Sequence, residues 1–160
     1  MVASILTVLL IWLHIVAVAV WIGGAVFMIY IFSPNLALLQ PPDAGKVGGA
    51  VGKKFTSVVW GAVAVTAITG LLRMYSAGLL DVNRLTGTSY GITLLLKIIL
   101  FVVMLGLGGM IGKTEKVLAT ATSPAEAVAA QKKMALLGKL VIGLGIVLIF
   151  VGIGLNYGIF

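Results

Sequence analysis

Four long runs of apolar residues constrain the fold of this chain more than any other feature of its sequence. They cover about residues 4–32, 55–77, 90–112 and 134–157. Each run is long enough to cross a bilayer, because a helix needs roughly 20 apolar residues to span a hydrocarbon core about 30 Å thick. Of the 160 residues, 61% are hydrophobic and only 9% are charged, which is too few for the surface of a soluble domain. We therefore predict an all-α polytopic membrane protein, a four-transmembrane-helix bundle that forms a single membrane domain over residues 1–160.

Basic residues are distributed unevenly among the predicted loops, and this bias predicts the orientation. The second loop holds only Arg84, whereas the first and third hold Lys46, Lys53, Lys54, Lys113, Lys116, Lys132 and Lys133. Loops rich in lysine and arginine stay in the cytoplasm, so we expect both termini and the second loop to lie outside. The net charge of +7 then comes from basic residues in the loops, as expected for a multi-pass protein of the plasma membrane in contact with the lipid bilayer. It does not indicate a nucleic-acid-binding protein.

Two prolines predict helix boundaries. The first helix is expected to end at Ser33-Pro34, because proline and the residue before it both oppose a continuing helix. In the third loop, Ser123, Pro124 and Glu126 have the order of an N-cap, a first helical residue and an acid in the first turn, which is typical of a helix start.

Glycines are frequent inside the third and fourth runs. They are Gly106, Gly108, Gly109 and Gly112 in the third, and Gly138, Gly143, Gly145, Gly152 and Gly154 in the fourth. Small residues allow close approach of helices in lipid. These faces are expected to pack within the bundle, or else to support a homo-oligomer or a larger membrane complex.

Three ionisable residues, His14, Arg73 and Lys97, lie within apolar runs, where charge is costly. With the predicted orientation, His14 lies about 15 Å below the outer end of the first helix and Lys97 about 10 Å below that of the third. Arg73 lies about one turn from the outer end of the second helix. Snorkelling to the interface would explain Arg73 or Lys97, and a bond to a neighbouring helix would explain His14. The alternative is that all three line one site in the outer half of the membrane.

The faces that carry these residues can be read from their spacing. One stripe of the first helix holds His14, Ala17, Trp21, Gly24 and Met28. A face of the second helix holds Thr66, Thr69, Gly70 and Arg73. Stripes of this kind point to the bundle interior, and a polar face opposite a His-bearing face predicts an internal cavity.

The residues near this predicted cavity limit its chemistry. Imidazole and thioether donors suit Cu(I), or a haem iron with His and Met axial ligands. By depth, Met74 is the best sulfur partner for His14, and Arg73 and Lys97 would pair with haem propionates or an anionic substrate. The four acids, Asp43, Asp81, Glu115 and Glu126, all lie in predicted loops, so hydrolytic catalysis is not expected. An oxidoreductase role would require haem.

Three segments resemble the copper-resistance D family. LHIVAVAVWIGG, Leu13 to Gly24, is similar to the family's first-helix signature of His, Trp and Gly-Gly. The resemblance continues through residues 53–74, with Thr69-Gly70 at a Thr-Gly position, and through residues 86–104, with Tyr90-Gly91 and Lys97 at matching places. It implies copper handling at the membrane. Typical members of the family are about twice as long, so this chain resembles their four-helix core.

The layout is more distantly similar to the haem-b-binding protoporphyrinogen oxidases of the HemJ type. Those enzymes also place a His in the first helix and a Lys in the third. This sequence lacks their other histidines and the arginine after the first helix, which argues against that activity. Three hypotheses follow: a copper-binding or copper-translocating protein with His14 and Met74 as ligands, a haem-b-binding redox protein with His14 as axial ligand, and an accessory subunit of a larger membrane complex.

Overall fold

The computed structural model describes residues 5–36 and 38–158, and its regular elements in these ranges are all helical. In chain order they are α1 (Ile5–Val26), η1 (Phe27–Phe32), α2 (Ser33–Leu36), α3 (Pro41–Ser76), α4 (Val82–Gly87), α5 (Ser89–Ala119) and α6 (Pro124–Tyr157). Four stretches are long and apolar enough to cross a membrane, namely Ile5–Leu36, Asp43–Ser76, Ser89–Ala119 and Pro124–Leu155. These findings confirm the predicted all-α class and the four spans, and they imply contact with a lipid bilayer. The orientation of the termini stays a prediction.

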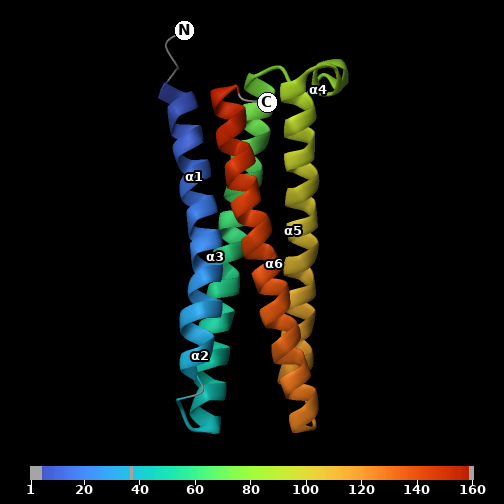
Figure 1. Cartoon of the computed structure of the whole chain (residues 1–160). Coiled ribbons are helices and arrows are strands. Elements are labelled where there is room, and N and C mark those ends of the chain that lie inside the picture. Colours follow the sequence, from blue (N-terminus) through green and yellow to red (C-terminus); the bar gives the residue numbers. More distant parts are fainter. Residues whose placement is uncertain (1–4, 37, 159–160) are drawn as a thin grey trace. The chain divides into compact units, whose positions relative to one another are not determined.

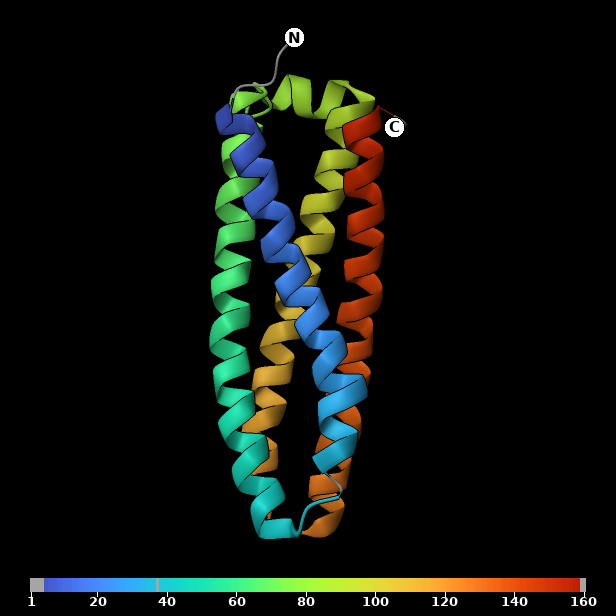
Figure 2. The same ribbon diagram turned by 90° about the vertical axis from the view of Figure 1, so that its left-hand side faces the viewer.

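The helices group into two compact units, the first ending at Asp81 and the second beginning at Val82. In the first unit, α1 and α3 run side by side in opposite directions (Figures 1 and 2). Their buried side chains are Ala17, Trp21, Ile22 and Ala25 of α1, and Ala62, Val63, Thr66 and Thr69 of α3. The single membrane domain proposed for residues 1–160 stays a prediction.

The first span does not end at Ser33-Pro34 as expected. It passes through a π-helical turn, η1, and continues as α2 to Leu36. The backbone N–H of Ser33 donates to the carbonyl of Met28, five residues earlier. Such a widened turn accommodates a proline, which has no N–H to donate and whose ring crowds the preceding turn of an α-helix. The side-chain amide of Asn35 donates from Nδ2 to Ile31 O at 2.6 Å, which satisfies one of the carbonyls around this irregular turn.

The helices are also longer than the apolar runs that predicted them. The helix α3 begins at Pro41, inside the expected loop, where proline suits the first position of a helix. The third span continues to Ala119, and the polar stretch before it forms the short helix α4. Polar residues show where a helix leaves the apolar layer of the membrane. The backbone hydrogen bonds of the helix continue past that point, so the helix is longer than its apolar run. As a result, Asp43, Glu115 and Glu126 lie in helices and not in loops.

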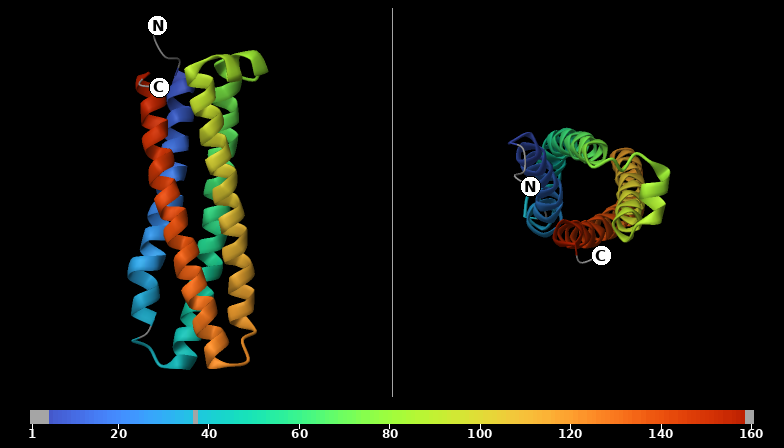
Figure 3. Two further views of the ribbon diagram at one scale, coloured as in Figure 1. Left: turned by 45° about the vertical axis from the view of Figure 1, so that its right-hand side comes forward. Right: turned by 90° about the horizontal axis from the view of Figure 1, so that it is seen from above.

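In the second unit, α5 and α6 lie side by side and antiparallel (Figure 3). The predicted start of the last helix is confirmed, because the Ser123 hydroxyl accepts a hydrogen bond from the backbone N–H of Glu126 at 3.2 Å. At the other end of the unit, α4 packs on the first turn of α5. A Cβ added to the buried Gly91 would clash with the backbone carbonyl oxygens of Leu85 and Arg84, so only glycine fits this contact.

Candidate functional site

His14, the only histidine of the chain, lies in α1 and faces α3. Its Nδ1 is 2.8 Å from the hydroxyl oxygen of Thr69, a bond that joins residues 55 positions apart in the sequence. His14 is about 14 Å along α1 from Ile5, and Thr69 about 10 Å from the end of α3 at Ser76. The antiparallel arrangement therefore brings the two side chains to a similar level within the first unit.

Thr69 is buried, with 4% of its surface exposed, and its hydroxyl contacts its own helix as well as His14. It lies 2.7 Å from Val65 O and 3.2 Å from Thr66 O. Thr66, one turn earlier and equally buried, makes the same kind of bond to Ala62 O at 2.8 Å. Threonine commonly bonds back to the preceding turn of a helix in this way, which satisfies its hydroxyl in an apolar environment.

The imidazole of His14 also packs against Gly70 of α3. A Cβ at this position would be 3.7 Å from His14 Cε1, which is an ordinary contact distance. The ring edge formed by Nδ1 and Cε1 thus faces Thr69 and Gly70, two successive residues of α3. In the predicted stripe of the first span, Ala17 and Trp21 are buried, and His14, Gly24 and Met28 are half-buried, with Met28 in η1. The predicted inward-facing stripes therefore meet along the contact between α1 and α3.

Arg73 and Met74 lie one turn beyond this contact, toward the end of α3, and both are half-buried. Met74 follows Gly70 by four residues, so it is one turn further along nearly the same side of the helix. Arg73 lies in the last turn of α3, where its positive charge is favourable beside the carbonyl end of the helix. The face of α3 that contacts His14 thus continues to Arg73 and Met74.

Lys97 belongs to the second unit and reaches from α5 onto α6. Its Nζ lies 2.8 Å from the position that a Cβ would take on Gly152, so the absence of a side chain there makes room for the amine. Lys97 is half-buried. The shared depth of Lys97 with His14 and Arg73, and the internal cavity, stay predictions.

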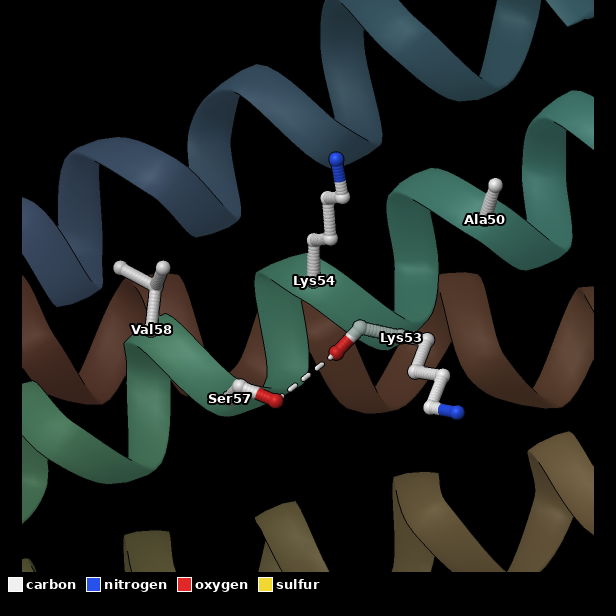
Figure 4. Close-up of a pocket in the computed structure, with 5 residues that line it drawn as sticks. All are labelled: Ala50, Lys53, Lys54, Ser57 and Val58. Atoms are coloured by element: carbon white, nitrogen blue, oxygen red, sulfur yellow. Dashed lines mark hydrogen bonds between the residues drawn. The ribbon is translucent and has the colours of Figure 1, made fainter.

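One hollow lies along the N-terminal half of α3, away from His14. Ala50, Lys53, Lys54, Ser57 and Val58 line it, and it is widely open. Figure 4 shows the amines of Lys53 and Lys54 pointing in opposite directions, while the Ser57 hydroxyl donates to Lys53 O at 3.2 Å. The two positive charges do not converge on one point, so this hollow has no focus for an anionic ligand.

A metal site built from several strong ligands is not found in the part of the chain that the structure describes. Across residues 5–36 and 38–158, no group of three or more His, Cys, Asp or Glu side chains could hold a metal ion. The thioethers differ in environment, since Met104 of α5 is fully buried and Met74 is half-buried. His14 carries an imidazole, and Met74 carries a thioether one turn beyond Gly70 on α3. Donors of these two kinds suit a soft ion such as Cu(I).

Sequence reasoning identified the face that includes Thr69 but missed its hydrogen bond to His14. The signal was present, because a threonine next to glycine on an inward face can both accept a bond and admit a ring. The contact of Lys97 with Gly152 had no such signal, since Gly152 is one of many glycines in α6 and the rotation of the two helices decides which one Lys97 meets.

The sequence was compared with models of known protein families. The family described as copper resistance protein D matches residues 49–155, about two thirds of the chain. The chain belongs to the copper resistance protein D family. No curated protein and no solved structure matches it. The match to the copper resistance protein D family covers Thr69, Gly70, Arg73, Met74 and Lys97, whereas His14 and Trp21 precede it.

Proposed function

We propose that this membrane protein binds or translocates copper, with His14 as a ligand. The observation that carries the proposal is the contact of His14 with the Thr69-Gly70 pair, which lies inside the segment matched by the copper resistance protein D family. An imidazole that is hydrogen-bonded through one nitrogen is the usual form of a histidine metal ligand, because the bond fixes the orientation of the ring. Copper here is the cargo of the protein.

Met74 is proposed as the second ligand. Side chains in a helix lean toward its N-terminus, so in the antiparallel pair His14 leans toward the Met74 level and Met74 leans back toward the His14 level. Met74 also follows Gly70 by one turn on the face of α3 that contacts His14. A thioether at this level, together with the imidazole, suits Cu(I).

Arg73 supports a second candidate, a haem-b-binding redox protein. A guanidinium on the face of α3 that contacts His14 would pair well with a haem propionate, and it would repel a copper cation that approached closely. Under the copper proposal, Arg73 and Lys97 shape the outer part of the site and do not contact the ion. The third candidate is an accessory subunit of a larger membrane complex, in which the glycine faces of α5 and α6 would contact a partner protein. Several glycines on these helices have open space where a Cβ would be, namely Gly106, Gly108, Gly109, Gly112 and Gly143.

The cofactor content of the purified protein distinguishes these candidates. The protein in mild detergent, and its His14→Ala variant, would be examined by visible spectroscopy and by metal analysis after exposure to Cu(I). We expect a colourless protein with about one copper per chain, and loss of that copper in the variant. A Soret band that disappears in His14→Ala would establish haem and refute the copper proposal. If neither cofactor is found and the variant changes only stability, the accessory-subunit candidate is favoured.

A further inference from the structure

The hydroxyl of Thr69 has a single proton and three polar neighbours, and this determines how it meets His14. Its oxygen lies 2.7 Å from Val65 O, 3.2 Å from Thr66 O and 2.8 Å from His14 Nδ1. Both carbonyls can only accept hydrogen bonds. The proton of the hydroxyl must therefore be directed at the backbone, because otherwise two oxygens would face each other at 2.7 Å without a proton between them.

With its proton committed to the backbone, the Thr69 oxygen can only accept from His14. The proton of that bond must then come from the ring, so Nδ1 carries hydrogen. A neutral imidazole has one N–H and one acceptor nitrogen. When Nδ1 holds the hydrogen, Nε2 is the nitrogen with the lone pair.

We propose that Thr69 is a positioning residue that holds His14 in the tautomer protonated at Nδ1, so that ligands bind through Nε2. The relay runs from His14 Nδ1–H to Thr69 and from the Thr69 hydroxyl to the carbonyl of Val65. The relay is anchored in regular helix at both ends, and Thr69 is almost completely buried, so water does not compete with it. The bond to Thr69 thus determines which imidazole nitrogen carries the hydrogen.

The inference rests on the proposed function only for the identity of the metal. The tautomer itself is a property of the protein without copper.

The chain offers a direct test because His14 is its only histidine. In protein labelled with ¹⁵N in the imidazole, without copper and at a pH where the ring is neutral, the two ring nitrogens give one pair of NMR signals. Wild type is expected to show a protonated Nδ1 and an unprotonated Nε2. Thr69→Ser keeps the hydroxyl and should keep this pattern, whereas Thr69→Val should give a mixture of tautomers or the reverse one. Thr66→Val is the matched control, because it removes an equally buried hydroxyl one turn away and should leave His14 unchanged.

Copper binding provides the second readout. Loss of the partner of a ligating histidine typically lowers metal affinity about 10- to 100-fold, so Thr69→Val should weaken Cu(I) binding by that factor and Thr69→Ser should restore it. A protonated Nε2 in wild type, or a Thr69→Val spectrum identical to that of wild type, would overturn the inference. If Thr69→Val does not fold, the wild-type spectrum alone decides. If the tautomer is found as stated and copper does not bind, the inference stands and the proposed function fails.

Discussion

The amine of Lys97 occupies the space that a side chain on Gly152 would need. Lys97 Nζ is 2.8 Å and its Cε 3.6 Å from the position of a Cβ at Gly152. A methyl group there would displace the amine, and the flexible lysine side chain would move more readily than the helix. The position of this intramembrane charge therefore depends on a glycine of the neighbouring helix.

Gly152→Ala is accordingly expected to move Lys97 without unfolding the protein. With ¹³C-dimethylated lysines, the Lys97 signal, assigned with Lys97→Arg, should shift in Gly152→Ala. Gly108→Ala is the control, since a Cβ at Gly108 has no neighbour within 4 Å and should leave the signal in place. An unchanged Lys97 signal in Gly152→Ala would contradict the contact.

A second glycine contact sets the spacing of α1 and α3. A Cβ at Gly24 would lie 2.6 Å from Cε2 of Phe55, whereas a Cβ at Gly23 has no neighbour within 4 Å. Gly24→Ala should be destabilising by about 1–3 kcal/mol through overpacking. Gly23→Ala should be neutral or stabilising by up to about 1 kcal/mol, because alanine favours the helix.

Thermal unfolding in detergent would measure the difference between these two variants. In a double-mutant cycle, Phe55→Leu should recover part of the stability lost in Gly24→Ala, because the smaller side chain leaves room for the added methyl. Equal stabilities of Gly23→Ala and Gly24→Ala would show that the close approach does not exist in the membrane protein.

The predicted orientation can be tested with single cysteines, because the chain contains none. A cysteine at Asp81 should react with a membrane-impermeant maleimide added to intact cells, and one at Gly49 should react only after the membrane is permeabilised. This follows from the lysine-rich first and third loops and the positive-inside rule. The opposite labelling pattern would invert the depths assigned to His14, Arg73 and Lys97.

Much of this architecture follows from the sequence, and the exceptions have physical causes. Apolar length predicts the four spans, and the Ser123 cap is local chemistry, so both were predictable. The continuation through Pro34 was not, because it needs a widened turn whose energy depends on neighbouring bonds such as that of Asn35. For the site, helical spacing identified the faces of His14 and Thr69. Their hydrogen bond depends on how α1 and α3 are rotated and shifted against each other, which spacing within one helix does not determine.

Met74 differs from the other methionines because it lies one turn beyond Gly70, which packs against the imidazole of His14. Met74→Leu conserves volume, so its cost in stability should stay below about 1.5 kcal/mol. Cu(I) affinity should nevertheless fall about tenfold or more, which equals about 1.4 kcal/mol of binding free energy. Met104→Leu, in the fully buried methionine of α5, should leave Cu(I) affinity unchanged. Equal affinities of both variants in a chelator competition would exclude Met74 as a ligand.

The most direct test of the copper assignment is a Cu(I) titration of wild type and His14→Ala against a competing chelator. Thr66→Val, which changes a buried polar residue of the same unit and leaves the bond between His14 and Thr69 in place, serves as the control for the fold. We expect about one Cu(I) per chain in wild type and in Thr66→Val, and a loss of affinity of at least about tenfold in His14→Ala. Wild-type affinity in His14→Ala would contradict the copper assignment.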